Sequence, residues 1–327
     1  MNRISIIILN WNWWKDTIEC LESLYRIEYQ NYEVILVDNY STNDSIEKII
    51  SWTKWDIEVD SKYFEKTKCT HELKIFEYSK EDLENWKYLQ KKNEYDKLEG
   101  NKKLFLLKND KNYGFAWWCN SWIRQVLSKW NSNYIFLLNN DTVIEKNYFN
   151  EIFIKLQDVD KQKIWCVWWK IFDYNKNDYR IKKYNHMNWI SNVHELTGAW
   201  LLISVNSLKS EWLFDEYMFL YCEDYDLTYR ISNKFNNYYI DTSSKLFHKS
   251  EASSNNIFEK KLILQIRNQF ILYKRHNKYY SLKNFLRTIL IFLDNNRKIN
   301  LLISVKSFII WVLKWIYEFI FNKWAIY

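Results

Sequence analysis

The sequence contains no proline, and only 3 of its 327 residues are glycine. Proline-rich spacers, glycine-rich linkers and collagen-like repeats are therefore excluded. Average glycine usage of about 7% would give roughly 23 glycines in a chain of this length. Tryptophan, by contrast, occurs 19 times. The glycine and tryptophan counts together come close to the expected number of glycines, which indicates that most tryptophan positions are glycine in a parent protein.

A difference between genetic codes would explain such an exchange. The codon UGA is read as tryptophan in one variant code and as glycine in another. We predict that a gene using the glycine code has been translated with the tryptophan code. The alternative is a protein that is truly rich in tryptophan.

The sequence shows neither the cysteine pattern of a disulfide-bonded protein nor a secretory signal. The 5 cysteines form no CxxC pair, and they lie at positions 20, 69, 119, 166 and 222. An odd number of scattered cysteines favours a reducing compartment. The first apolar run, ISIIIL at residues 4–9, is too short for the core of a signal peptide. We therefore expect a cytoplasmic protein.

The overall composition is that of a folded protein. Hydrophobic residues make up 48% of the chain and charged residues 27%, so a sizeable core is expected and disorder is not. The net charge of +7 is modest. It is compatible with an anionic lipid surface or a phosphorylated substrate, and it does not by itself argue for a nucleic-acid partner.

Buried-strand patterns alternate with helical patterns over the first part of the chain. Continuous apolar runs, typical of strands buried on both faces, lie at residues 4–9, 32–39, 104–109 and 134–141. Helical spacing of apolar residues is seen at 16–25, where Asp16 or Thr17 is the expected cap, and at 117–130. Strands joined by helices predict a parallel sheet in a three-layer α/β domain.

The same alternation continues beyond Asp141. We expect a helix near 146–157 and strands near 163–172 and 196–204. A loop entering a helix then follows, and a final strand and loop occupy 238–250. Residues 51–103 are charged and weakly periodic, so they are expected to form a short helix, a strand and an elaborated surface loop.

The chain from about residue 281 onward has a different character. Residues 301–324 carry polar side chains at roughly helical spacing, and Lys306 and Lys314 interrupt the apolar run. No 18 uncharged residues follow one another there, so a membrane-spanning helix is not expected. Two interpretations stay open. The segment is either an interfacial helix on the cytoplasmic leaflet, or a helix packed on the rest of the chain or on a partner.

Polar clusters lie where the predicted strands end, which is where an open parallel sheet binds its ligands. Asp38 follows the second strand and could accept hydrogen bonds from a base or ribose, although its Ser, Thr and Asn neighbours also suit a helix-capping turn. The run NNDT at 139–142 offers oxygen ligands for a hard divalent cation. His248 could add a nitrogen ligand, but a lone histidine is also common as a structural group.

A third kind of cluster is the acidic run CEDYD at 222–226. Glu223, Asp224 and Asp226 repel one another, and one of them can thereby be held as a base near neutral pH. The alternative is a solvated start of a helix, where the helix dipole favours acidic side chains.

Seven motifs together resemble the family 2 glycosyltransferases of the GT-A fold, and the rhamnosyltransferase-like members most of all. In chain order, between about residues 3 and 255, they are ISIIILNWN, VDNYSTND, KNYGFA, FLLNNDT, LTGA, FDEYMFLYCEDYDLTYR and FHKS. The resemblance implies a three-layer α/β catalytic domain with a mostly parallel central sheet at 1–255. It leaves an amphipathic helical region at 256–327, for which membrane association is one of the two interpretations given above. Relatives usually have glycine where this chain has Trp13, Trp117, Trp118, Trp122 and Trp212.

The resemblance also implies roles for particular residues. Asp224 would be the catalytic base, with Glu223 on the acceptor side. Asp141 is similar to the last carboxylate of the family's DxD-like motif and would bind Mg²⁺ or Mn²⁺, with His248 as a second protein ligand. The remaining contacts to the nucleotide-sugar or the acceptor would come from Asn10, Asn12, Asp38, Asn112, Gly114, Asn139, Thr197 and Gly198.

The implied activity is an inverting transfer of a sugar to a hydroxyl of a cell-surface polysaccharide or a lipid-linked glycan. The donor would be dTDP-rhamnose or a UDP-sugar, and the site of action the inner face of the cell membrane. One alternative is a catalytically silent protein that keeps the fold and scaffolds a glycan assembly complex. Another is a nucleotidyltransferase, but NWNWWKD at 10–16 is a poor match to the glycine-rich basic loop expected of that class.

Overall fold

The computed structural model describes residues 1–65, 67–68, 73–129, 131–158, 164–169, 171–177, 190–193, 200–208, 213–232, 235–240, 242–249 and several positions between 264 and 276. Thr197, Gly198, Trp212 and the predicted C-terminal helix lie outside the described residues. The chain forms two compact units. The first comprises Met1–Phe219 and Glu223–Ser253, and the second comprises Leu220–Cys222 and Ser254–Tyr327. The helices and strands described below lie in the first unit.

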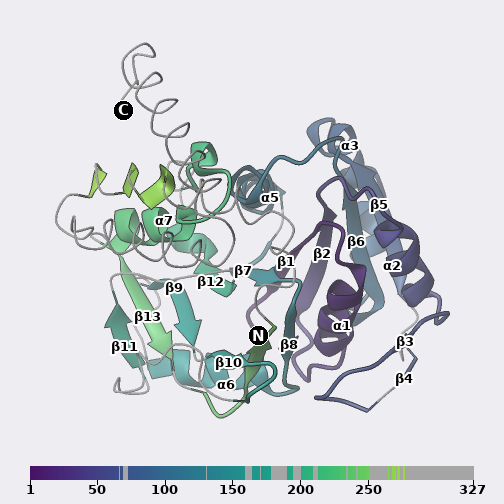
Figure 1. The fold of residues 1–327 in the computed structure, drawn as a ribbon, viewed down its shortest axis with the longest axis horizontal. Helices are drawn as coiled ribbons and strands as arrows, with labels where there is room; N and C mark the ends of the chain where they lie inside the picture. The colour runs from purple at the N-terminus through teal and green to yellow at the C-terminus, as the bar shows by residue number, and fades with distance from the viewer. Residues whose placement is uncertain are drawn as a thin grey trace, which may run out of the picture. The chain divides into compact units, whose positions relative to one another are not determined.

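A mixed sheet forms the centre of this unit. In the described part of the chain it has nine strands in the order β11-β13-β9-β12-β7-β1-β2-β6-β5, which run side by side from left to right in Figure 1. Their bounds are β1 Ile4–Asn10, β2 Tyr32–Asp38, β5 Lys74–Ser79, β6 Lys103–Lys108, β7 Tyr134–Asn139, β9 Ile164–Trp169, β11 Ile190–Val193, β12 Trp200–Ser204 and β13 Asn236–Ile240. The neighbours from β7 to β5 are all parallel, so the predicted fold class is confirmed.

The apolar runs explain why the middle strands are buried on both faces. Every residue of β2 is buried, and β1 is buried at all but one position. Helices connect these strands and flank the sheet (Figure 1). They are α1 Trp14–Tyr25, α2 Ser45–Thr53, α5 Phe115–Lys129, α6 Tyr148–Lys155 and α7 Glu223–Ser232. Burying both faces of a sheet requires such helices, which is the layered arrangement that the alternating pattern predicts.

A second, three-stranded sheet has the order β10-β14-β8. Its strands are β8 Thr142–Ile144, β10 Ile171–Asp173 and β14 Leu246–His248. The single strand expected at 163–172 is therefore wrong, because that segment supplies one strand to each sheet. The final strand and loop expected at 238–250 likewise contain two strands, β13 and β14, one in each sheet. An apolar run cannot reveal this break, since both halves have the same pattern and only pairing separates them. The second sheet sets His248 opposite Thr142.

Residues 51–103 are more structured than the predicted helix, strand and loop. They contain the edge strand β5, the two-stranded pair β3 Glu58–Val59 and β4 Thr67–Lys68, and the helices α3 Lys80–Glu84 and α4 Lys92–Tyr95. A capping box between Ser79 and Asp82 starts α3. Short 3₁₀ turns complete the unit at Lys87–Lys91, Gly100–Lys102, Leu156–Asp158, Val205–Ser207 and Glu216–Met218.

The predicted cap of the first helix is also wrong. Helix α1 begins at Trp14, and its N-cap, Trp13, makes no side-chain capping bond. Thr17 instead donates to the Oδ1 atom of Asn10 at 2.8 Å. The hydroxyl of Thr17, which the sequence pattern predicts as a helix cap, thus binds the buried side-chain amide of Asn10.

The described helices include none that is both long enough and apolar enough to cross a lipid bilayer.

Gly100 provides a test of how closely the start of β2 is packed. A Cβ atom at Gly100 would lie 1.7 Å from the carbonyl oxygen of Tyr32, the first residue of β2. We expect Gly100→Ala to lower the free energy of unfolding by about 1–3 kcal/mol, because the backbone must shift to relieve the overlap. Urea unfolding measures this, with Lys102→Ala, at an exposed position of the same turn, as the control. Equal stability of the two variants would contradict the packing described.

Candidate functional site

The carboxyl ends of the parallel strands bring polar residues to one edge of the sheet. Asn10, the last residue of β1, is paired in register with Asp38, the last residue of β2. On the other side of β1, Leu9 is paired with Asn139, the last residue of β7. Strand β1 thus has β2, the next strand in the sequence, on one side and β7, a much later strand, on the other. This is the kind of switch point where open α/β sheets bind ligands.

Asp38 is held by a dense set of hydrogen bonds and is only 1% exposed. Its Oδ1 atom accepts from Asn10 Nδ2 at 2.7 Å and from Ser41 Oγ at 2.5 Å, and its Oδ2 atom accepts from Ser41 N at 2.8 Å. An ionised carboxylate has about four acceptor positions. Asp38 therefore fixes the loop after β2 with three of them and keeps one for a further donor.

The loops that follow β1 and β2 are joined to each other. Asn12 has a positive φ of 62°, a conformation that asparagine tolerates better than most residues. Its N–H donates to Ser41 Oγ at 2.9 Å, and its Oδ1 atom accepts from Thr42 N at 2.7 Å. Asn12 thus joins the two loops through hydrogen bonds of both its side chain and its backbone.

Thr17 extends this network to the turn after β7. Its hydroxyl donates to Asn10 Oδ1 at 2.8 Å and accepts from Asn140 Nδ2 at 2.9 Å. Asn140 adjoins Asp141, so one chain of hydrogen bonds links the Asp38 loop to the predicted metal-binding turn. Sequence reasoning did not find this role for Thr17, because the bonds join positions far apart in the chain.

The loop before α5 is built around Asn112 and Gly114. Asn112 Oδ1 accepts from Asn39 Nδ2 at 2.9 Å and from Gly114 N at 2.9 Å. Gly114 has a φ of 78°, and a Cβ atom there would lie 2.4 Å from a ring carbon of Phe219. Glycine is therefore required at 114 by both its backbone conformation and the close approach of Phe219.

The tryptophans at the start of α5 are accommodated unequally. Trp117 stacks on Tyr113 with ring centroids 4.1 Å apart. Trp118 is 3% exposed, and its Nε1 atom has no hydrogen-bond partner in the described part of the chain. A buried N–H group without a partner is destabilising. Glycine at 118 would not carry this cost, and its presence in the native protein stays a prediction.

The two predicted metal ligands are neighbours in space. His248 Nε2 lies 3.0 Å from Asp141 Oδ1, and both side chains are about nine-tenths buried. Asn139 Nδ2 lies 3.4 Å from the same His248 nitrogen, and the ring of Trp200 packs edge-on against the imidazole at 4.9 Å. Pairing of β14 with β8 places His248 beside Thr142 and so produces this contact.

This pair can supply only part of a metal site. Within the described ranges, no group of three or more His, Cys, Asp or Glu side chains is arranged to hold a metal ion. The Asp141 carboxylate suits Mg²⁺ or Mn²⁺, and the imidazole of His248 can add a nitrogen ligand. The remaining positions of a cation here would have to be filled by donor phosphate oxygens or water.

The acidic residues at the start of α7 have different surroundings. Glu223 and Asp224 are 6% and 8% exposed. Burial, followed by the nearby charge of Asp224, raises the pKa of Glu223 well above its usual value near 4.5. Glu223 Oε2 has no hydrogen-bond partner among the residues described. Asp226, by contrast, accepts from Arg230 Nε at 2.8 Å and is part of the helix framework.

The segment that leads into α7 is docked on α5. The carbonyl of Phe219 accepts from Phe115 N at 2.7 Å, and Asn120 Nδ2 donates to the carbonyl of Phe214 at 2.8 Å. The charge of Glu223 also contributes, after burial, to the raised pKa of Cys119 on α5. The start of α7 and the loop at 112–115 therefore form one connected region.

Known proteins resemble this chain in sequence over one segment and in fold over most of its length. Residues 5–68 match the family model described as glycosyl transferase family 2. The mannosyltransferase PcManGT from Pyrobaculum calidifontis, solved with GDP-Man and Mn²⁺, has a TM-score of 0.55 and 12% identity, over 97% of this chain and 81% of its own. S. aureus TarS has a TM-score of 0.48 and 14% identity, over 86% of this chain. No curated protein matches the sequence.

The match to PcManGT concerns the fold, since identity is low. The present chain spans only 44% of the TarS chain. The likeness to PcManGT confirms the predicted α/β fold. The family model agrees with the predicted class of enzyme, a glycosyltransferase, over residues 5–68. The rhamnosyltransferase-like character is not addressed by them.

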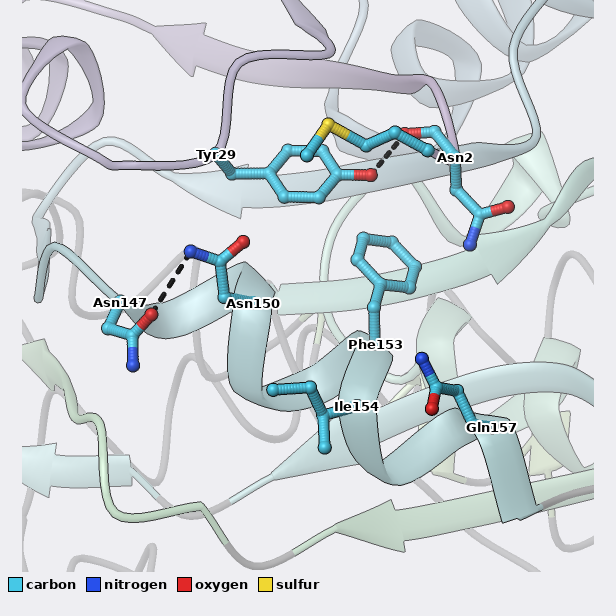
Figure 2. Close-up of a pocket in the computed structure, with 8 residues that line it drawn as sticks. Asn2, Tyr29, Asn147, Asn150, Phe153, Ile154 and Gln157 are labelled. Carbon is cyan, nitrogen blue, oxygen red and sulfur yellow. Dashed lines mark hydrogen bonds between the residues drawn. The ribbon is translucent and has the colours of Figure 1, made fainter.

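A pocket of about 540 Å³ lies elsewhere on the sheet. Figure 2 shows Tyr29 and Asn2 on one side of it and Asn150, Phe153 and Ile154 of α6 on the other. Asn2 precedes β1 and Tyr29 precedes β2, so the pocket adjoins the amino ends of these strands. It is therefore separate from the edge where Asn10, Asp38 and Asn139 meet.

The raised pKa of Glu223 predicts a pH dependence of stability. Above the usual glutamate pKa near 4.5, the unfolded chain releases a proton that the folded protein keeps. The free energy of unfolding therefore falls as pH rises toward the raised pKa, by at most about 1.4 kcal/mol per pH unit. Glu223→Gln cannot titrate and should flatten this dependence.

Urea unfolding between about pH 5 and about pH 8 measures the difference. The exposed Glu47, on α2, provides the control variant Glu47→Gln. Parallel stability curves for wild type and Glu223→Gln would show that Glu223 is not held protonated.

Proposed function

We propose that this protein is an inverting glycosyltransferase that transfers a sugar from a nucleoside diphosphate to a hydroxyl group of a glycan. The observation that carries the proposal is the approach of His248 to Asp141 at 3.0 Å, on the turn that follows β7. This turn is linked by hydrogen bonds through Thr17 and Asn10 to the loop of Asp38. A cation-binding pair and a base-binding carboxylate on one edge suit a nucleotide joined to a diphosphate.

The proposed donor is dTDP-rhamnose, with a UDP-sugar as the second choice. Thymine and uracil both present an imide N–H, and the remaining acceptor position of Asp38 can receive it. The sugar itself rests on the resemblance to rhamnosyltransferase-like proteins. PcManGT, which shares the fold, is recorded with GDP-Man and Mn²⁺, so a purine donor belongs among the compounds to be tested.

The proposed chemistry divides the work between the two acids at the start of α7. Asp224 accepts the proton of the acceptor hydroxyl. The hydroxyl oxygen of the acceptor meanwhile attacks the anomeric carbon from the face opposite the nucleotide. Glu223, with its raised pKa, holds a proton and can donate a hydrogen bond to the acceptor. A bound Mg²⁺ or Mn²⁺ would supply positive charge beside the departing diphosphate. A single displacement of this kind inverts the anomeric centre.

The proposed acceptor is a cell-surface polysaccharide or a lipid-linked glycan, and the proposed place of action is the inner face of the cell membrane. Both rest on the resemblance and on the amphipathic pattern of residues 301–324. A lipid-linked acceptor would require such membrane contact.

A second candidate is a catalytically silent protein of the same fold. One observation favours it. Trp117 stacks on Tyr113 at 4.1 Å, and Trp118 is buried next to it, at the start of α5 directly after the loop of Asn112 and Gly114. If both tryptophans are native, their bulk would oppose close approach of a nucleotide-sugar to this backbone.

A nucleotide-release assay over dTDP-, UDP- and GDP-sugars with Mn²⁺ tests the proposal. Asp224→Asn should lower turnover by about 10²–10⁴, the usual contribution of a general base, and should leave donor binding intact. The exposed Asp44, at the start of α2, gives the control Asp44→Asn. Near-normal turnover of Asp224→Asn would remove that residue from its role. Donor binding without any release by the wild type would favour the silent protein.

A further inference from the structure

Lys249 occupies a largely buried group of charges next to the candidate metal ligands. Its Nζ atom lies 2.5 Å from Asp16 Oδ1 and also contacts Glu19 Oε2, both on α1. The side chain of Lys249 is 20% exposed, that of Asp16 13% and that of Glu19 5%. Tyr174 donates its hydroxyl to the other oxygen of Glu19 at 2.7 Å. Ion pairs as buried as these are far less screened by water than surface pairs.

The backbone around Lys249 is tied to both ligands of the candidate metal site. Lys249 N donates to the carbonyl of Asp141 at 3.0 Å, and Tyr174 N donates to the carbonyl of His248 at 3.1 Å. Lys249 directly follows His248, the last residue of β14. The same residue is thus anchored to α1 by its side chain and to Asp141 by its main chain.

We propose that Lys249 is a positioning residue, which anchors the His248 strand to α1 and thereby holds His248 and Asp141 in the geometry that binds a divalent cation. This rests on the proposed function. The alternative, that Lys249 binds the donor diphosphate, is disfavoured because two carboxylates already surround its ammonium group. Burial alone would lower the pKa of Lys249, but hydrogen bonds to Asp16 and Glu19 outweigh it and raise the pKa above the usual value.

The test measures Mn²⁺ binding by electron paramagnetic resonance on the full chain, without donor. Lys249→Met should weaken Mn²⁺ binding by about tenfold or more, as loss of groups that orient metal ligands usually does. Lys249→Arg keeps the charge and should recover most of the affinity. Glu19→Gln keeps Lys249 but loosens one of its two contacts, so it should give an intermediate loss. It also replaces Lys249→Met if that variant fails to fold.

The outcomes separate this inference from the proposed function. His248→Ala and Asp141→Asn are measured alongside. If these two weaken Mn²⁺ binding and the Lys249 and Glu19 variants do not, Lys249 has no positioning role although the site is correct. If His248→Ala and Asp141→Asn leave Mn²⁺ affinity unchanged, the metal site itself is wrong.

An independent observation concerns two tryptophans at helix ends. Helix α2 ends at Thr53, and Trp55 follows with a φ of 71°; α3 ends at Glu84, and Trp86 follows with a φ of 57°. A positive φ is a genuine outlier for so bulky a residue, whereas glycine adopts it freely. Both residues are also substantially exposed, by 46% and 40%.

The hydrogen bonds show why the backbone turns in this way. After α2, Trp55 N donates to the carbonyl of Trp52 at 3.0 Å, and Asp56 N donates to that of Ser51 at 3.1 Å. These two bonds define the Schellman motif, which usually has glycine at the position of Trp55. After α3, Trp86 N donates to the carbonyl of Leu83 at 3.0 Å, the corresponding bond.

We infer that residues 55 and 86 are glycine in the protein made by its native host. Neither position is among the five at which relatives usually have glycine. The composition does not say which tryptophans are affected, so backbone geometry identifies these two positions. Trp52 gives the contrast. It is fully buried, lies inside α2 and donates its Nε1 to Glu22 at 3.0 Å, so it is a tryptophan that the fold uses.

Mass spectrometry of tryptic peptides from the native host is the test. Cleavage after Lys48, Lys54 and Lys62 gives neighbouring peptides 49–54 and 55–62, which separate position 52 from position 55. We expect tryptophan at 52 and glycine at 55 and 86. Tryptophan at 55 and 86 would overturn the inference. On recombinant protein, Trp55→Gly and Trp86→Gly should raise the melting temperature and Trp52→Gly should lower it; a fall for all three would equally count against it.

Discussion

The parallel pairing of β1 with β2 and β7 is the constraint on which the candidate site depends. It sets Asn10 beside Asp38 and Leu9 beside Asn139, so side chains from distant parts of the chain end at one edge. The buried amide of Asn10 then connects the loops, since it donates to Asp38 and accepts from Thr17. A shift of the register by one residue would turn these side chains to the opposite faces of the sheet and break every one of these bonds.

The second sheet contributes His248, the second candidate metal ligand, to the site. Strand β8 leaves the edge directly after Asp141, and β14 returns to pair with it, which brings His248 to Asp141. The largely buried charges of Lys249, Asp16 and Glu19 fasten this returning strand to α1. The candidate metal site is thus held from two sides, by the hydrogen-bond network of β1 and by the ion pairs of α1.

Much of the fold follows from the sequence, because long apolar runs such as 4–9 and 32–39 have few alternatives to a buried strand. The single strand near 163–172 was wrong, and residues 238–250 contain a second strand where a loop was expected. Nothing in an apolar pattern marks where a chain passes from one sheet to another. The helix cap at Asp16 or Thr17 was wrong because both side chains serve distant partners, Lys249 and Asn10. Candidate residues for the site could be named by type and position, but their contacts depend on strand pairing between distant parts of the chain.

The central claim is that Asp141 and His248 together bind the cation that accompanies a nucleotide-sugar. Anomalous diffraction from crystals grown with Mn²⁺ and UDP or dTDP tests it most directly. The account predicts one strong manganese peak bonded to an Asp141 carboxylate oxygen and to His248 Nε2, with diphosphate oxygens completing its coordination. A manganese peak bound elsewhere, or a nucleotide held with neither residue near its metal, would contradict the account.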